Sequence, residues 1–278
     1  MKGKIINACL LVLAGITIAS CKKEHNEVPA GPPPVQGKHI LLKDITELNL
    51  PAPYYHFEYN ADSMVTKADF ASGYSTYDVL YSGDKIAEMR DDIIVNHDTL
   101  RYVYDNSGKP TMLKFINTDN VAYRLVFFKY EHDQIKEIEW DQKIADVGYM
   151  IDRTLSFTFY PDGNVKTITE HRPPATGVPD YVSVKSFEQY DDKINVDDFS
   201  LIHDGFHDHL FLLQGFRLQT NNPKKETLSV NGVDLYHIDY TYTYNPDQTP
   251  SVKAGDFIYL SGANAGQRFQ TNSSYTYY

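Results

Sequence analysis

A short unit recurs along most of this chain: an aromatic or aliphatic residue, one intervening residue, a second aromatic residue, a polar turn and an alternating strand. The clearest copy runs from Tyr102-Val103-Tyr104 through Asp105-Asn106-Ser107-Gly108 into residues 112–115. Alternate residues of a strand face the same side, and Asn-Ser-Gly or Pro-Asp-Gly sequences let the chain reverse within a few residues. The unit therefore predicts a hairpin. Further copies begin at Phe57, Val79, Phe128, Phe157 and Tyr242.

The early copies lie about 22 to 30 residues apart, so consecutive hairpins are expected to pair with one another. Residues 135–140, Ile-Lys-Glu-Ile-Glu-Trp, come close to strict alternation of apolar and polar side chains. We therefore expect an all-β domain over residues 39–278. Its expected architecture is an antiparallel meander of hairpins that forms a strongly curved sheet or an open or closed barrel. A β-sandwich is the alternative.

One segment near residues 197–213 interrupts this pattern. Asp197 or Asp198 could cap a helix, and the apolar residues that follow are spaced by three or four positions. This spacing predicts a single amphipathic helical insert that covers one opening or one face of the sheet. Its apolar positions are Phe199, Ile202, Phe206, Leu210 and Leu213.

The first 21 residues have the layout of a secretory leader. Lys2 and Lys4 precede an almost wholly apolar stretch, which ends in Ile18-Ala19-Ser20-Cys21. The stretch is too short to remain as a membrane-spanning helix. Residues 1–20 are therefore predicted to be a signal peptide. Residues 21–38, which contain Pro-Ala-Gly-Pro-Pro-Pro-Val-Gln-Gly, are predicted to be a flexible tether.

The small residues before Cys21 resemble the lipobox of bacterial lipoproteins. That resemblance implies that Cys21 becomes the acylated N-terminus and anchors the protein in a lipid bilayer. More than one acyl chain gives stable anchoring, since each buried methylene contributes about 0.8 kcal/mol. The alternative is an ordinary signal peptide that leaves Cys21 as a plain thiol.

The repeats resemble YD-type repeats, in which an aromatic-x-Tyr strand is paired with an Asp- or Asn-Gly turn. They are also similar to a group of Bacteroidota lipoproteins of unknown function. The resemblance implies a lipid-anchored protein of the outer membrane, on either its surface-exposed or its periplasmic side. The partners expected on this basis are the lipid bilayer, through acylated Cys21, and a glycan or an envelope protein.

Cysteine usage and charge exclude several functions. Cys9 leaves with the leader and Cys21 would be acylated, so thiol catalysis and Cys-ligated zinc are excluded in the body. Two of the 26 basic side chains lie in the leader, so 24 remain against 37 acidic ones. Nucleic acid is not an expected partner, because binding to phosphates needs a basic face.

His203 and His207 are the candidate metal ligands. On a helix, imidazoles four residues apart lie one turn apart and can share a metal ion. Asp204, Asp208 and His209 lie beside them in the sequence. The alternative is that these residues form the polar face of the helix, opposite its apolar stripe.

Trp140 is the candidate ligand-binding residue, because an aromatic face can stack on a sugar ring. The alternative role for Trp140 is core packing or cross-strand pairing. Residues 275–278 resemble the aromatic last strand of outer-membrane barrels, but charged residues are spread too evenly along the chain for a lipid-facing band.

The sequence carries no catalytic signature. It has no Gly-x-Ser-x-Gly elbow, and the Gly-rich residues 261–266 lack the Lys-Ser/Thr of a phosphate loop. Acidic pairs such as Asp191-Asp192 fall in expected turns or caps. We therefore expect a non-enzymatic envelope lipoprotein with a binding or scaffold role and no cofactor. The alternative is a surface lipoprotein that binds or processes glycans.

Overall fold

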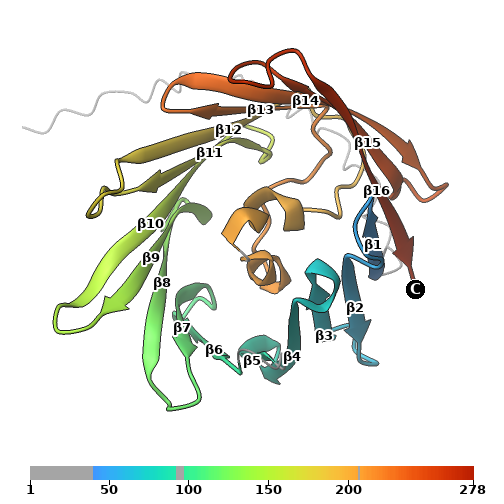
Figure 1. Cartoon of the computed structure of the whole chain (residues 1–278). Helices are drawn as coiled ribbons and strands as arrows, with labels where there is room; N and C mark the ends of the chain where they lie inside the picture. Colours follow the sequence, from blue (N-terminus) through green and yellow to red (C-terminus); the bar gives the residue numbers. More distant parts are fainter. Residues whose placement is uncertain (1–39, 92–96, 206) are drawn as a thin grey trace, which may run out of the picture. The chain divides into compact units, whose positions relative to one another are not determined.

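Sixteen antiparallel strands close into one barrel in the part of the chain that the structure describes (Figure 1). This structure is a computed structural model and describes residues 40–91, 97–205 and 207–278. Each strand pairs with the next one in sequence, and β1 pairs with β16 to close the ring. The strands are β1 (Leu42–Glu47), β2 (Tyr55–Tyr59), β3 (Val65–Phe70), β4 (Ser75–Ser82), β5 (Lys85–Asp91), β6 (Thr99–Tyr104), β7 (Pro110–Ile116), β8 (Ala122–Glu131), β9 (Gln134–Ile144), β10 (Gly148–Phe159), β11 (Val165–Arg172), β12 (Tyr181–Glu188), β13 (Lys225–Val230), β14 (Val233–Tyr244), β15 (Pro250–Tyr259) and β16 (Arg268–Tyr277).

The expected all-β meander is confirmed, and the open question of closure is answered by the pairing of the two end strands. Leu42 pairs with Tyr277, and Ile45 pairs with Tyr275. The predicted leader 1–20, the tether 21–38 and Cys21 lie outside the described residues, so those expectations stay predictions. No helix among the described residues is long and apolar enough to cross a membrane.

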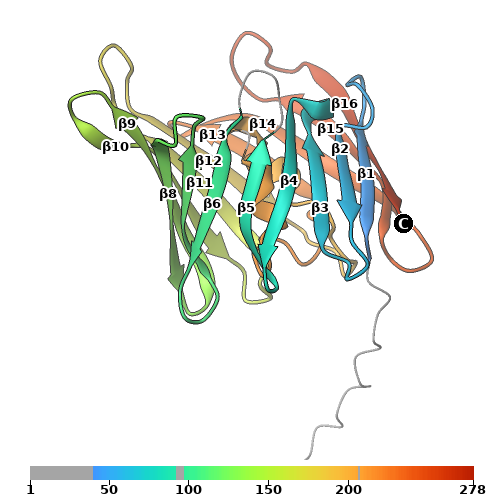
Figure 2. The same ribbon diagram turned by 90° about the horizontal axis from the view of Figure 1, so that it is seen from below.

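The barrel has two rims, which Figure 2 shows at the lower and upper ends of the strands. We call the end where β1 begins and β16 ends the near rim, and the opposite end the far rim. The near rim carries the short polar turns of the repeats. The described connections at the far rim span residues 48–54, 71–74, 117–121, 145–147, 173–180, 231–232 and 260–267, and residues 97–98 also lie there.

The second aromatic residue of the repeat has a defined structural role at the near rim. In four copies it is a tyrosine whose hydroxyl donates to a backbone carbonyl at the start of the preceding strand. A β-bulge lies immediately before each of these tyrosines, and bulges re-aim the following side chain. The donor and acceptor pairs are Tyr59 and Leu42 (2.8 Å), Tyr81 and Val65 (2.9 Å), Tyr104 and Ile86 (2.7 Å), and Tyr130 and Pro110 (3.0 Å).

The barrel wall is mostly apolar inside and mostly polar outside. On β9, Ile138 and Trp140 point inward and are buried, whereas Glu137 and Glu139 face outward and contact Lys129 of β8. The same arrangement recurs on other strand pairs. Outward contacts join Asp44 to His56, Glu88 to Arg101, Thr158 to Thr167, and Asp256 to Gln270.

The connection between β12 and β13 folds into the barrel interior, and we call residues 195–218 the plug. It contains two short 3₁₀ helices, η2 (Phe199–Gly205) and η3 (Asp208–Leu212), which lie within the ring of strands in Figure 1. A third, η1 (Ala71–Gly73), lies at the far rim. The apolar positions Phe199, Ile202, Leu210 and Leu213 are buried against the wall.

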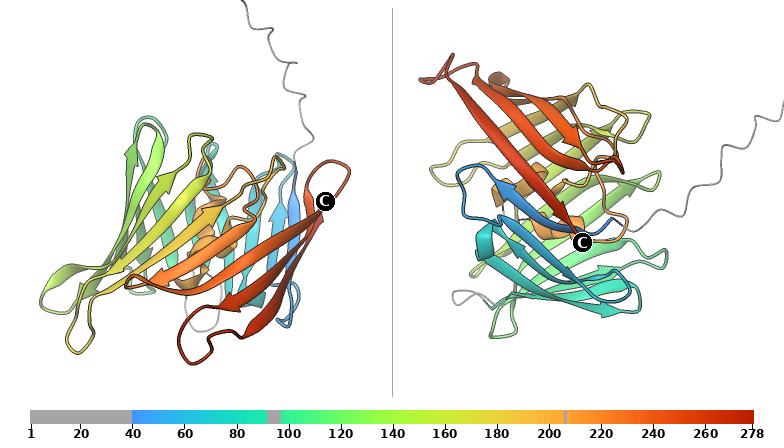
Figure 3. Two further views of the ribbon diagram at one scale, coloured as in Figure 1. Left: turned by 90° about the horizontal axis from the view of Figure 1, so that it is seen from above. Right: turned by 90° about the vertical axis from the view of Figure 1, so that its right-hand side faces the viewer.

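The expected single helix over residues 197–213 is therefore corrected to two 3₁₀ turns inside the barrel. A sixteen-stranded barrel is too wide for its wall side chains to fill, so an inserted segment completes the core. Such a segment follows the shape of the cavity, and its backbone kinks at Ile202 (φ −126°, ψ 24°). Figure 3 shows the same segment within the barrel from two further directions.

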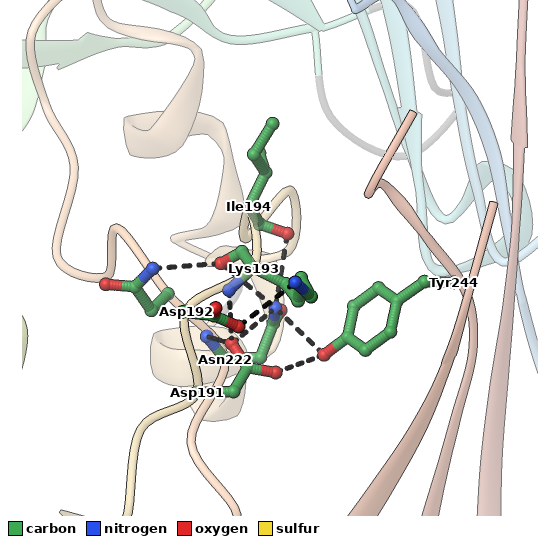
Figure 4. Close-up of polar contacts among 7 residues, drawn as sticks. Asp191, Asp192, Lys193, Ile194, Asn222 and Tyr244 are labelled. Carbon is green, nitrogen blue, oxygen red and sulfur yellow. Dashed lines mark hydrogen bonds and ion pairs between the residues drawn. The ribbon is translucent and has the colours of Figure 1, made fainter. Parts of the chain in front are cut away.

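A polar cluster fastens the two ends of the plug connection to each other and to β14 (Figure 4). Asn222 Nδ2 donates to the carbonyls of Lys193 (3.4 Å) and Ile194 (3.2 Å), and Asp191 Oδ1 accepts from the Asn222 backbone N–H at 3.2 Å. The Tyr244 hydroxyl donates to Asp191 Oδ2. These contacts hold the plug connection at the near rim.

Candidate functional site

A chain of three polar side chains joins the plug to the barrel wall. His203, on η2, has Nε2 2.8 Å from the Tyr54 hydroxyl and Nδ1 2.9 Å from Asp208 Oδ2. The Tyr55 hydroxyl lies 3.2 Å from the same Nδ1. A carboxylate that accepts from Nδ1–H leaves Nε2 as the acceptor for a hydroxyl. The contacts therefore fit an Asp–His–Tyr relay.

The burial of this relay is graded. The Asp208 side chain is 2% exposed, whereas the His203 side chain is 26% exposed. Burial raises the pKa of Asp208, and its contact with His203 opposes that effect. Burial, together with the Asp208 charge, also raises the pKa of Tyr54. The relay therefore runs from a buried carboxyl group to partly exposed imidazole and phenol groups.

A second cluster lies against the relay and brings two carboxylates together. Glu47 Oε2 accepts from the Ser273 hydroxyl at 2.9 Å, and Asp197 Oδ2 accepts from the Tyr275 hydroxyl at 2.9 Å. Lys253 Nζ lies 3.7 Å from Asp197 Oδ2. Burial and the Asp197 charge raise the pKa of Glu47 to about 7. Near neutral pH, Glu47 can therefore either donate or accept a proton.

We call the relay and this second cluster the lumenal site. It combines groups that can hydrogen-bond a polar ligand inside the barrel. Asp197 Oδ1 is buried and has no hydrogen-bond partner among the described residues, which is costly unless a water or ligand supplies one. The residues come from η2, η3, the segment before η2, and from β1, β2, β15 and β16.

Sequence reasoning missed most of the lumenal site. Asp208 stood out only as a neighbour of the histidines, and Asp197 only as a helix cap. No local pattern marked Glu47, because residues far apart in sequence converge on the site. The paired tyrosines 54 and 55, at the start of a strand, were the one available signal.

Trp140 lies in the core of the barrel and is 1% exposed. Its ring stacks at 4.7 Å and 31° on His207, and the Arg153 guanidinium lies 4.6 Å from its centroid. Burial, followed by the Arg153 charge, lowers the pKa of His207. The ring has no open face here, and the prediction that Trp140 binds a ligand stays untested.

His203 and His207 contact different walls of the barrel. His203 faces Tyr54 and Tyr55 of the β2 region, whereas His207 stacks on Trp140 of β9. Among the described residues, no group of three His, Cys, Asp or Glu side chains is placed to hold a metal ion. The predicted metal role of His203 and His207 stays a prediction, and zinc calorimetry on wild type and His203→Ala would test it.

Two solved structures of porin-like proteins are similar in fold to this chain. No family model and no curated protein matches it. A porin-like protein from Bacteroides uniformis ATCC 8492 is similar, with a TM-score of 0.59 and 13% identity over 86% of this chain and 95% of that one. A porin-like protein from Bacteroides vulgatus ATCC 8482 has a TM-score of 0.55 and 16% identity over 86% and 99%. At this identity the likeness establishes the fold alone.

Proposed function

We propose that this chain is a lipid-anchored protein of a bacterial cell envelope, and that its plugged barrel is a binding module. The proposed anchor is acylated Cys21, and the proposed location is the outer membrane, facing either the surface or the periplasm. The observation that supports this proposal is the polarity of the outward face of the barrel. A barrel that crosses a membrane needs an apolar outer band about 25 Å tall.

The outer face of this barrel is polar where a membrane barrel would be apolar. Lys129, Glu137 and Glu139 form ion pairs on the outer face of β8 and β9 at 2.7 and 3.1 Å. Charged residues on a lipid-facing surface destabilise a membrane barrel by several kcal/mol at the bilayer midplane. An aqueous surface is the compatible environment, so the protein would need a separate anchor to stay at a membrane.

The filled interior argues for binding over transport. Plug residues Phe199, Leu210 and Leu213 are buried in one core with wall residues such as Phe57 and Trp140. A porin-like channel has a polar, water-filled lumen instead. The lumenal site and the rims are therefore the places where this protein would engage a partner.

Palmitate labelling and fractionation test the anchor. Wild-type protein expressed in a Gram-negative host is expected to incorporate labelled palmitate, and Cys21→Ala is expected to lose the label. Cys9→Ala is the matched control, because this cysteine lies in the leader, and it should keep the label. The chain without its leader and with Cys21→Ala should be soluble without detergent. Detergent-dependent extraction of that chain, or an unlabelled wild type, contradicts the proposal.

One observation favours glycan processing as a second candidate. Hydrolysis of glycosidic bonds needs a carboxylic acid with a raised pKa beside a second carboxylate. Glu47 has such a raised pKa, and the charge of Asp197 acts on it. Release of reducing sugar from polysaccharides by wild type, lost in Glu47→Gln, would support this alternative. Equal release by both proteins would exclude a role for Glu47.

A further inference from the structure

Four aromatic side chains on the inner wall near the far rim are not covered by the plug. Tyr236 on β14, Phe257 and Tyr259 on β15, and Phe269 on β16 follow the same alternation as buried Tyr240 and Tyr275, so they face inward. Phe257 lies 4.4 Å from Tyr236, 4.8 Å from Tyr259 and 6.3 Å from Phe269 between ring centroids. We call these four residues the aromatic wall.

The exposure of the aromatic wall sets it apart from the rest of the barrel interior. Phe269 is 51% exposed, and the other three side chains are partly exposed. Inward aromatics under the plug, such as Phe57 and Trp140, are 1% exposed. Leaving a cluster of rings open to water forgoes the stabilisation that burial of this apolar surface would give. Such a cluster is a candidate recognition surface.

Polar groups lie on the same inward face as the aromatic wall. Glu226 of β13 accepts hydrogen bonds from the hydroxyls of Tyr236 (3.3 Å) and Tyr240 (3.0 Å). Further along the inner wall, Lys253 lies 4.7 Å from the Tyr240 ring centroid. Rings beside a few hydrogen-bonding groups are the usual composition of a ligand site.

The charges on this face restrict the ligand. Glu226 is the carboxylate that contacts the aromatic wall, whereas the inward-facing Lys253 and Lys185 are held by Asp197 (3.7 Å) and by the Leu201 carbonyl of the plug (3.1 Å). The whole chain also carries a formal charge of −11. Nucleic acids, phosphorylated ligands and acidic polysaccharides are therefore disfavoured by electrostatic repulsion.

We propose that the aromatic wall binds the sugar rings of a neutral oligosaccharide. The C–H face of a sugar can lie on an aromatic face, and its hydroxyls can donate to Glu226. This inference rests on the proposed binding function and gives it a ligand class and a position. The position differs from Trp140, because the plug covers Trp140 and leaves Phe257 and Phe269 accessible.

Affinity electrophoresis of the full mature protein tests the proposal. Native gels would contain soluble starch, xylan, mannan or dextran as neutral probes, and polygalacturonate as an acidic probe. We expect at least one neutral polysaccharide to retard the wild type and polygalacturonate not to do so. Phe257→Ala and Phe269→Ala should each weaken retardation about tenfold, which corresponds to about 1.4 kcal/mol. Tyr74→Ala is the matched control, because Tyr74 is 61% exposed at another part of the far rim, and it should bind like wild type.

Three results would overturn the proposal: no retardation by any neutral probe, unchanged retardation of the Phe257→Ala/Phe269→Ala double variant, or equal retardation by polygalacturonate. Circular dichroism of each variant separates loss of binding from loss of folding, and Phe269→Ala is the informative variant if Phe257→Ala unfolds. Palmitate labelling at Cys21 is independent of these gels. A failed anchor and a failed sugar site are therefore distinguishable.

Discussion

His203 Nδ1 lies 2.9 Å from Asp208 Oδ2, and this contact joins the two turns of the plug where they meet β2. The Tyr55 hydroxyl is 3.5 Å from the other carboxylate oxygen. A buried carboxylate with two such neighbours organises the segment that fills the barrel. The contact therefore links the stability of the plug to the geometry of the lumenal site.

Removing the Asp208 carboxylate should destabilise the protein. Asp208→Ala leaves His203 and Tyr55 without their shared acceptor, and a buried group that loses its partner costs about 1–3 kcal/mol. Urea unfolding followed by circular dichroism measures the change in the free energy of unfolding. Asp152→Ala is the matched control, since its side chain is 52% exposed and lies 3.9 Å from Arg124 at the surface. Its effect should stay within about 1 kcal/mol. Equal effects of the two variants would contradict a structural role for Asp208.

Glu47 should make the protein less stable as the pH rises from about 4.5 to 7. Its pKa is raised from 4.5 to about 7 in the folded state, so the folded state binds more protons in this window. Stability then falls with rising pH, by up to about 3 kcal/mol for a shift of this size. Glu47→Gln should match wild type near pH 4.5 and exceed it above pH 7. Unfolding curves across this range measure the difference, and a constant difference at all pH values would show that Glu47 titrates normally.

His209 should make the protein less stable as the pH falls below about 6.5. Burial lowers its pKa from 6.5 to about 3, so the unfolded state takes up a proton first as the pH falls. The free energy of unfolding should therefore fall by about 2 kcal/mol between pH 6.5 and 5 because of His209. His209→Gln keeps an acceptor for the Tyr102 hydroxyl, which lies 3.0 Å from Nδ1. The variant should show a shallower loss of stability in that window, and parallel wild-type and variant profiles would refute the assignment.

The tyrosines of the near rim should each contribute through their hydroxyls. Tyr104→Phe removes the donor to the Ile86 carbonyl and should cost about 0.5–1.5 kcal/mol in unfolding free energy. Tyr130→Phe should behave alike, because its hydroxyl donates to the Pro110 carbonyl. Tyr181→Phe is the control. The Tyr181 ring lies 5.2 Å from the Arg172 guanidinium, and phenylalanine keeps this ring contact. A larger effect at Tyr181 than at Tyr104 would contradict the role given to the repeat.

Much of the fold was readable from the sequence because its signals are local. The unit around Tyr102 and Tyr104 predicted a strand, a turn and a return strand, and the structure has β6 and β7 there. The apolar stripe from Phe199 to Leu213 marked the one segment that breaks the meander. The single helix predicted for this segment was wrong, because the spacing of apolar residues indicates which of them are buried but not the shape of the cavity that buries them.

The sequence alone determined the hairpins, their polar turns and the alternation that gives each strand an apolar face, since all three depend on residues close together in the chain. The tertiary structure decided closure, because β1 and β16 are separated by almost the whole domain. It also decided the position of the plug, since the width of a sixteen-stranded ring leaves a space that the wall cannot fill. Because the plug occupies that space, the tertiary structure also brought Glu47, His203 and Asp208 together. The part of the wall that the plug does not reach left Phe257 and Phe269 uncovered.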